Sequence, residues 1–267
     1  NYFGSRFDQI LIGKFLGATY LGYYTLAFEL VLQPLKRINP IINRVFFPVY
    51  ARLQKENEKL REIFFRTLKY LGLIAYPMLF GLIALAKPFV LTVYGDKWLE
   101  IVNLLQVLAL VAVVIVHNNP FGSIILAKGR ADIAFHLDLG VLIVRVIAIA
   151  LTVKYGLIYI AFGLLVANLL IKFASYFLFM KPMLGRCLLE YAYHAFLVPV
   201  FYSFIMCVGL FIIIQFVTLD ALITLVAGTV VGAIIYFFVL LIFERRLVFK
   251  FFEYFRSKIS SLSTANP

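Results

Sequence analysis

Residues 220–244 read DALITLVAGTVVGAIIYFFVLLIFE, an uncharged apolar run bounded by Asp220 and Glu244. A helix needs about 20 apolar residues to cross a hydrocarbon core of about 30 Å, and this run is long enough. Turn residues and charges divide the rest of the chain into seven more apolar segments. The eight segments are residues 1–17, 20–50, 62–93, 98–127, 131–154, 156–180, 192–217 and 220–244.

The composition matches a chain that lies in lipid. Of the 267 residues, 64% are hydrophobic and 14% are charged, and the mean hydropathy is +0.99. Soluble domains are only about 45–50% apolar, so a soluble fold is excluded. Transmembrane β-strands do not need long apolar runs, so a β-barrel is excluded as well. The sequence predicts an all-α, polytopic bundle of about eight transmembrane helices.

The net charge of +12 does not indicate nucleic acid as a partner. A nucleic-acid-binding protein clusters Lys and Arg on one soluble face, whereas here these residues lie between apolar segments. The two cysteines, Cys187 and Cys207, form neither a disulfide framework nor a set of metal ligands. We therefore expect no nucleic-acid partner, no metal site and no cofactor.

The connections between the segments alternate between basic and charge-poor. The basic ones are residues 52–69, 128–130 and 181–186 and the tail after residue 244; the charge-poor ones are residues 18–19, 94–97, 154–156 and 218–220. The positive-inside rule places the basic connections in the cytoplasm. With eight crossings, residue 1 and the C-terminal tail are then both cytoplasmic.

The two ends of the chain have features of their own. The first apolar segment is too short to span a membrane, and the chain does not begin with Met, so we expect a fragment whose first helix is truncated. Residues 245–259 mix aromatic and basic side chains, which is typical of a helix lying on anionic lipid. A solvated terminal helix fits that pattern too.

Basic residues inside the apolar segments are candidate binding residues. A charge at mid-bilayer costs about 2.5–3.5 kcal/mol, so such residues usually face a cavity or a partner. Lys14 and Arg44 lie near segment ends and are expected to extend toward the membrane surface. The remaining candidates for binding a substrate are Arg6, Lys36, Arg37, Arg145 and Lys172. Because cations dominate this set, an anionic passenger such as a phosphate is favoured.

The second segment carries the strongest polar pattern. Its polar residues recur at helical spacing and share one face, opposite an apolar face. Three prolines interrupt its backbone hydrogen bonds, as in the broken helices that line transporter cavities. We therefore interpret the polar face as a cavity wall; a buried ion pair between Glu29 and Lys36 or Arg37 is the alternative. The polar face holds Glu29, Gln33, Lys36, Arg37, Pro40 and Arg44, the apolar face Phe28, Val31, Leu35, Ile38 and Ile42, and the prolines are Pro34, Pro40 and Pro48.

Four acidic or titratable residues also lie inside the apolar segments. They are Asp8, Glu29, Asp138 and His117. His117 begins a polar cluster, His-Asn-Asn-Pro, and could titrate. Such a cluster is also often satisfied by neighbouring helices. Asp8 needs a partner from another helix, and Arg145 is one possibility.

Several motifs together resemble a known family, the polysaccharide transporter branch of the MOP flippase superfamily, which includes Wzx-type O-antigen and colanic-acid exporters. The resemblance covers residues 1–180 well and the last two segments only by hydropathy. The motifs are Arg6-Phe7-Asp8-Gln9-Ile10-Leu11-Ile12-Gly13, Leu16-Gly17, Leu21-Gly22-Tyr23-Tyr24-Thr25-Leu26-Ala27, Pro34, Val45-Phe46-Phe47-Pro48, Pro77, Pro88, Gly95-Asp96-Lys97-Trp98 and Ala127-Lys128-Gly129-Arg130.

The resemblance implies an architecture and a function. Residues 1–180 would be the C-terminal six-helix lobe of a fourteen-helix parent, residues 181–244 an additional helix pair, and residues 245–267 a cytoplasmic amphipathic tail. The family moves undecaprenyl-diphosphate-linked oligosaccharides across the bacterial inner membrane by alternating access. Under this resemblance, Asp8, Glu29, Asp138 and His117 are candidates for coupling transport to Na⁺ or H⁺. The implied partners are this lipid-linked oligosaccharide, membrane lipids and the missing N-terminal half. Glu29 is a departure, because related lipid II flippases have Arg on the corresponding helix.

Three other functions were weighed against this one. A membrane glycosyltransferase or polymerase usually carries a large external loop and a set of catalytic residues, and the sequence shows neither. We therefore expect no enzyme activity. An antiporter of the same superfamily that exports cations would favour acidic walls. A purely structural scaffold does not explain the intramembrane charge.

Overall fold

The computed structural model describes residues 7–216, 220–249 and 253. Every regular element in these residues is a helix, which confirms the predicted all-α class. In chain order the elements are α1 (Phe7–Leu16), α2 (Ala18–Arg52), α3 (Asn57–Ala84), α4 (Ala86–Tyr94), the 3₁₀ turn η1 (Asp96–Trp98), α5 (Ile101–Ile115), α6 (Asn118–Ala127), α7 (Ala131–Thr152), the 3₁₀ turn η2 (Val153–Tyr155), α8 (Leu157–Ser175), the π-helical turn η3 (Tyr176–Met180), α9 (Lys181–Leu184), α10 (Leu188–Ala192), the π-helical turn η4 (Tyr193–Leu197), α11 (Val198–Phe216) and α12 (Ala221–Phe243).

Six helical stretches of the described chain are long and apolar enough to cross a membrane. A helix suits this environment because it satisfies its own backbone hydrogen bonds. The polytopic membrane fold is thus confirmed. The six stretches are Asn57–Ala84, Ile101–Ala127, Ala131–Tyr155, Leu157–Leu184, Leu188–Gln215 and Ala221–Phe243.

The prolines of α2 do not break it. The sequence predicted one helix over residues 20–50 with prolines interrupting its backbone hydrogen bonds, and α2 is continuous over 35 residues with Pro34, Pro40 and Pro48 inside. Each proline removes one backbone donor. The helix continues because its apolar face is held in the core: Val31 and Leu35 are buried, and α2 packs against α3, α5 and α6. The predicted division of α2 into an apolar and a polar face is confirmed.

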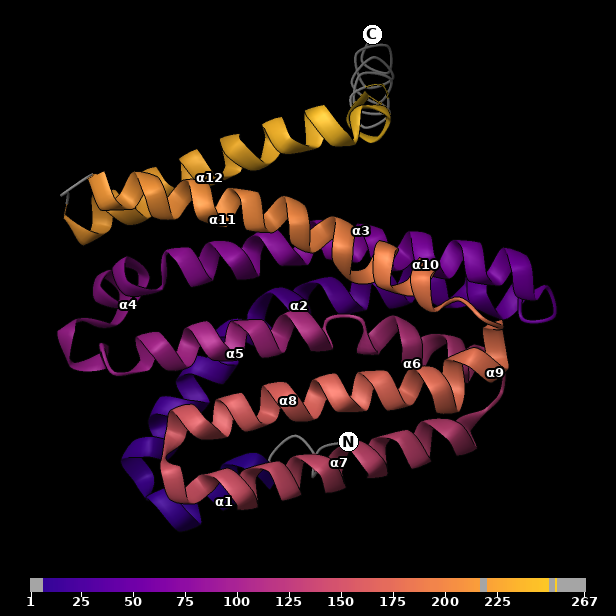
Figure 1. The fold of residues 1–267 in the computed structure, drawn as a ribbon, viewed down its shortest axis with the longest axis horizontal. Helices are drawn as coiled ribbons and strands as arrows, with labels where there is room; N and C mark the ends of the chain where they lie inside the picture. Colours follow the sequence, from indigo (N-terminus) through magenta and orange to yellow (C-terminus); the bar gives the residue numbers. More distant parts are fainter. Residues whose placement is uncertain (1–6, 217–219, 250–252, 254–267) are drawn as a thin grey trace, which may run out of the picture.

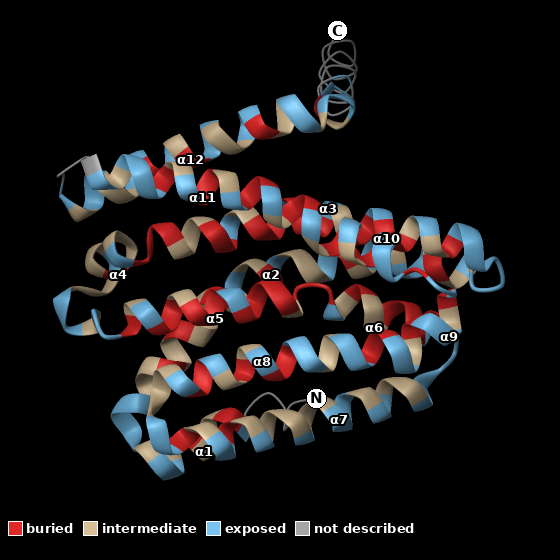
Figure 2. Ribbon diagram, in the orientation of Figure 1, coloured by how far each residue is buried: buried red, intermediate tan, exposed pale blue. Residues whose placement is uncertain are grey.

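The helices form a slab, and Figure 1 shows the order of its front layer as α7, α8, α5, α3, α11 and α12. Each of these helices packs on the next, and α2 passes behind α5. Figure 2 shows more buried residues on α5 than on α7. Within the most apolar part of each membrane-crossing stretch, 67% of the residues are buried in the α5–α6 stretch but only 6% in the α7 stretch. The α5–α6 span is therefore the centre of the bundle, and α7 is an outer helix.

The basic connections gather at one end of the slab. The connections α2–α3, α6–α7 and α9–α10 and the end of α12 lie at the right of Figure 1, and the connections α4–α5 and α7–α8 lie at the left. The structure therefore brings together the connections that the sequence grouped by charge. That this end faces the cytoplasm stays a prediction from the positive-inside rule.

The last two long helices attach to the bundle unequally. α11 packs along α3 so closely that a Cβ on Gly72 would lie 2.8 Å from Pro199 Cγ. α12 packs on α11 and α4 but makes little contact with α3. Between α3, α4, α11 and α12 this leaves a cavity of about 590 Å³ lined almost wholly by apolar side chains, which we call the apolar cavity.

Candidate functional site

A cavity of about 730 Å³ lies between α2, α6, α7 and α8, and we call it the amide cavity. Three of these four helices belong to the membrane-crossing stretches. Its walls combine apolar side chains with a concentrated set of polar ones. The polar lining residues are Asn43, Arg44, Asn118, Asn119, Ser123, Asp138, Lys172 and Ser175.

A hydrogen-bonded amide network joins α2 to α6 in this cavity. Asn43 Nδ2 donates to Asn119 Oδ1 (3.2 Å), and Asn119 Nδ2 donates back to Asn43 Oδ1 (3.0 Å). Ser123 Oγ donates to the same Asn43 oxygen at 2.8 Å. Asn43 still has one N–H without a partner in the described structure, and side-chain amides bind both donors and acceptors. The network is therefore a polar wall with hydrogen-bonding capacity left for a ligand.

The local sequence explains why these amides reach the cavity. α5 ends at Ile115 and α6 restarts at Asn118, with Pro120 in its first turn, where the missing N–H costs no helical hydrogen bond. The restart leaves Asn118 and Asn119 at the beginning of a new helix inside the membrane-crossing stretch.

The amide cavity is lined by two cations, Lys172 and Arg44, and one carboxylate, Asp138. Lys172 Nζ donates to the neutral Asn118 Oδ1 at 2.5 Å. Within the described residues, neither Lys172 nor Arg44 forms an ion pair within 4.0 Å. The lining thus holds more cations than carboxylates, and this excess of positive charge among membrane-spanning helices favours an anionic ligand.

The structure separates the other predicted site residues from this cavity. Lys36 is ion-paired with Glu29 on the surface of α2, where their side chains are 50% and 43% exposed, and Arg37 is exposed nearby. The alternative ion pair is therefore present, but on an exposed face. Arg6 lies outside the described residues. Of the predicted substrate-binding residues, Lys172 lines the amide cavity, as does one ion-coupling candidate, Asp138.

Asp8 and Arg145 come together elsewhere, where α1 packs against α2 and α7. Asp8 is 2% exposed and accepts a hydrogen bond from the Tyr24 hydroxyl at 3.3 Å. Arg145 interacts with it electrostatically, without an ion-pair contact within 4.0 Å. Asp8 Oδ1 and Arg145 Nε are both buried without a hydrogen-bond partner in the described structure. The two residues are therefore close enough to influence each other, and their pairing stays a prediction.

His117 points away from the amide cavity. It is 1% exposed, and Nε2 lies 3.2 Å from the carbonyl oxygen of Leu68. Nδ1 lies 3.4 Å from the Tyr76 hydroxyl, and the ring packs edge-on against Phe196. The contacts hold His117 between helices; its role in ion coupling stays a prediction.

Sequence reasoning missed much of the amide cavity. Asn43 and Ser123 were not candidates, and Arg44 was expected to reach the membrane surface. A signal was present, because Asn39 and Asn43 on α2 and Asn119 and Ser123 on α6 are spaced four apart and so share a face. What the spacing lacked was the information that these two faces meet.

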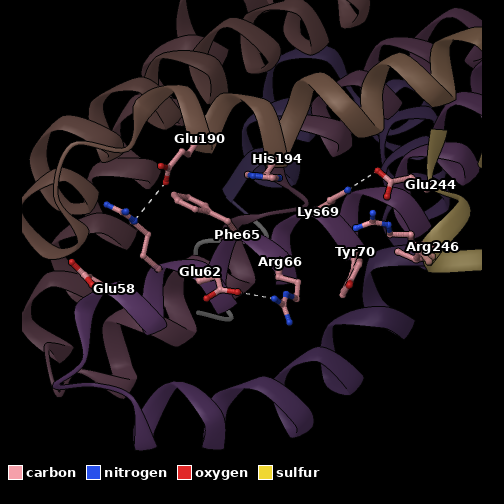
Figure 3. Close-up of a pocket in the computed structure, with 12 residues that line it drawn as sticks. Glu58, Glu62, Phe65, Arg66, Lys69, Tyr70, Glu190, His194, Glu244 and Arg246 are labelled. Atoms are coloured by element: carbon pink, nitrogen blue, oxygen red, sulfur yellow. Dashed lines mark hydrogen bonds and ion pairs between the residues drawn. The ribbon is translucent and has the colours of Figure 1, made fainter. Parts of the chain in front are cut away.

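A third cavity, of about 600 Å³, lies at the basic end of the slab between α3, α10, η4 and the segment after α12 (Figure 3). Its charges are largely paired with one another, so we call it the ion-paired cavity. Lys69 Nζ lies 2.5 Å from Glu244 Oε1, Arg61 Nε 3.5 Å from Glu190 Oε2, and Arg66 Nη2 2.7 Å from Glu62 Oε1. Sequence analysis did not foresee this cavity.

The chain has relatives among known proteins. The family described as polysaccharide biosynthesis protein matches residues 1–103. The chain is 45% identical to the teichuronic acid biosynthesis protein TuaB of Bacillus subtilis strain 168 over 156 residues, 58% of this chain and 32% of TuaB. It is 31% identical to an uncharacterised membrane protein in the cps region of Klebsiella pneumoniae over 249 residues, 93% of this chain and 51% of that protein.

It is also 35% identical to the lipopolysaccharide biosynthesis protein WzxC of Escherichia coli strain K12 over 192 residues, 72% of this chain and 39% of WzxC. These matches span between a third and about half of the length of the relatives. No solved structure matches the chain. The chain belongs to the polysaccharide biosynthesis proteins, in the polysaccharide transporter branch of the MOP flippase superfamily.

Proposed function

We propose that this chain is the passenger-binding part of a flippase that moves lipid-linked oligosaccharide across the bacterial inner membrane by alternating access. The observation that carries the proposal is the amide cavity, a polar space between helices of membrane-crossing type whose lining holds more cations than carboxylates. Polar residues at this depth are costly and usually functional. The relatives point the same way, because their names assign them to polysaccharide and lipopolysaccharide biosynthesis.

The chemistry of the cavity suits a glycan with an acidic group. Asn43, Asn119 and Ser123 offer amide and hydroxyl groups to sugar hydroxyls, and Lys172 and Arg44 offer positive charge to a phosphate. On the exposed face of α2, Arg37 forms no ion pair in the described residues and Lys36 is paired with Glu29, and we also assign this second polar surface to the passenger. An undecaprenyl diphosphate linkage supplies both the anion and the lipid.

Transport needs no bond to be made or broken, so we propose no catalysis by this chain. An anionic headgroup moving outward follows an inside-negative potential, which is worth about 2.3 kcal/mol per charge per 100 mV. The cations therefore need to bind the passenger without trapping it. In our proposal the basic end of the slab and the C-terminus face the cytoplasm.

The test is the fate of the lipid-linked intermediate when the complete gene encoding this chain is deleted. We expect surface polysaccharide to disappear and the lipid-linked repeat to accumulate on the cytoplasmic side, measured by lipid extraction, mass spectrometry and protection from an impermeant lectin. Complementation with wild-type protein should restore export, and the double variant Lys36→Ala, Arg37→Ala should not. Lectin-accessible intermediate in the deletion strain would refute the proposal.

A further inference from the structure

The break between α5 and α6 contacts different parts of the bundle through three consecutive residues. His117 contacts α3 and η4. Asn118 accepts a hydrogen bond from Lys172 of α8, and Asn119 exchanges hydrogen bonds with Asn43 of α2. The break lies inside a membrane-crossing stretch, and Figure 1 shows it as a short connection near the middle of the slab. The rotation of this short segment therefore decides how the two amides are presented to the amide cavity.

The backbone alone does not fix this rotation. α5 ends at Ile115 and α6 begins at Asn118, so the regular helix is interrupted between them. Pro120 has no N–H, so it cannot donate to the carbonyl oxygen of Val116 four residues earlier. Prolines at such positions allow the direction of a helix to change. Side-chain contacts are then needed to hold the break in one arrangement.

The His117 side chain supplies these contacts on the side away from the cavity. A buried ring without a carboxylate partner stays neutral, and His117 forms no ion pair in the part of the chain that the structure describes. The carbonyl oxygen of Leu68 can only accept, so Nε2 carries the hydrogen and donates to it at 3.2 Å. The Phe196 ring packs edge-on, with the ring centroids 5.3 Å apart. These contacts define one orientation of the imidazole.

Tyr76 connects this anchor to the beginning of α11. Its buried hydroxyl lies 3.4 Å from His117 Nδ1 and donates to the carbonyl oxygen of Ala195 in η4 at 3.1 Å. Pro199, four residues after Ala195, has no N–H to donate to that carbonyl, so the hydroxyl takes its place. The hydroxyl has one hydrogen for two acceptors, and Ala195 is the nearer one. The bond to Leu68 is therefore the main restraint on His117.

We propose that His117 is a positioning residue for the passenger, which sets the rotation of the break and so directs Asn118 and Asn119 into the amide cavity. Asn118 in turn holds the ammonium group of Lys172, and Asn119 completes the amide network. The inference rests on the proposed function, because it is the passenger that these groups bind. The role requires neither a change in the protonation of His117 nor a contact between His117 and the passenger.

Cross-linking in the complete protein tests the positioning without any measurement of transport. Asn43→Cys and Asn119→Cys place two thiols across the cavity, in a background that carries Cys187→Ala and Cys207→Ala, and a short bifunctional thiol reagent joins them. This pair also removes the reciprocal amide bonds, so the yield depends more on His117. His117→Phe keeps a ring but loses the donor to the Leu68 carbonyl, and we expect the yield to fall about fivefold. His117→Gln, whose amide N–H has a similar reach, should recover most of it.

Tyr236→Phe is the matched control. The Tyr236 hydroxyl donates to the carbonyl oxygen of Leu73 at 2.6 Å, so this variant also removes one hydrogen bond to α3, but away from the break. It should lower the melting temperature comparably and leave the cross-link yield unchanged. A full yield in His117→Phe would overturn the inference, and so would an equal fall in Tyr236→Phe. Monodisperse elution shows that each variant is folded; if His117→Phe is not, Tyr76→Phe should still lower the yield about twofold.

The affinity for the passenger is the second measurement. The lipid-linked repeat extracted from the deletion strain is titrated into the protein in lipid nanodiscs, with the native Asn43 and Asn119 in place. His117→Phe should raise the Kd about fivefold, whereas His117→Gln and Tyr236→Phe should leave it nearly unchanged. A lower melting temperature with an unchanged Kd in His117→Phe would make His117 an ordinary core residue and contradict the inference.

The two proposals fail in different ways. Normal export by the deletion strain would refute the proposed function, and the passenger role of His117 with it. Normal binding and full cross-linking by His117→Phe would refute the positioning role and leave the proposed function standing.

Discussion

The amide cavity and the ion-paired cavity are of similar size and both contain charged side chains, but they satisfy their cations differently. In the ion-paired cavity, Lys69 and Arg61 each contact a carboxylate. In the amide cavity, Lys172 donates to the neutral oxygen of Asn118 and forms no ion pair within the part of the chain that the structure describes. A cation paired with a carboxylate mainly holds helices together, whereas a cation paired with an amide keeps its charge available for a ligand. Charge alone therefore does not mark a transport site; the partner of the charge does.

Among single substitutions, replacing Lys172 should have the largest effect on transport. Lys172→Gln removes the available positive charge but keeps a side chain able to hydrogen-bond to Asn118, so we expect export to fall at least about tenfold with insertion unchanged. Surface polysaccharide and protein level in the membrane are the measurements. Lys154→Gln, an exposed change at the other end of the slab, is the control. Normal export by Lys172→Gln would show that a cation bound to an amide is no more important for transport than a cation paired with a carboxylate.

Breaking the Lys69–Glu244 pair should affect stability instead. The two side chains are only 20% and 17% exposed, so Lys69→Met leaves a largely buried carboxylate without its partner. Losing one member of a fully buried pair costs 3–5 kcal/mol, and we expect about 1–3 kcal/mol at this partial exposure. Thermal unfolding in detergent measures the loss. The exchanged pair Lys69→Glu, Glu244→Lys should recover part of it, and an unchanged melting temperature for Lys69→Met would show that the pair does not hold α12.

The amide network should contribute less to the free energy of unfolding than the Lys69–Glu244 ion pair does. Asn119→Ala removes the reciprocal partner of Asn43, and we expect a loss of about 1 kcal/mol in unfolding free energy, typical of a hydrogen bond in a protein. Export should fall as well, because the polar wall is incomplete. Ser175→Ala, which removes a different polar side chain from the cavity lining, tests whether any such removal lowers stability and export. Equal destabilisation by both variants would argue against a specific network.

The exposed ion pair between Arg130 and Asp132 should contribute least to stability and to export. Both side chains are more than half exposed, and exposed pairs are weakened by solvent. Arg130→Gln should leave the melting temperature and export unchanged. A marked fall in either would show that exposure does not separate structural from incidental ion pairs in this protein.

The sequence by itself predicted the membrane fold and the grouping of its connections. Long apolar runs and their charged ends are local properties of the chain, and the lipid environment converts them directly into helices that cross a membrane. The two faces of α2 followed from the same local reasoning, because Val31 and Leu35 recur at helical spacing. The exposure of Lys36 on the opposite face agrees with that pattern.

The cavities were decided by the tertiary structure. Asn43 meets Asn119, and Lys69 meets Glu244, because helices far apart in the chain pack at particular depths and rotations. Periodicity gives the face of a helix but not the helix that this face will meet. The continuity of α2 through three prolines has the same origin, since its apolar face packs against α3, α5 and α6. The chain thus specifies its helices residue by residue, and only their packing determines which polar side chains are neutralised and which remain available to a ligand.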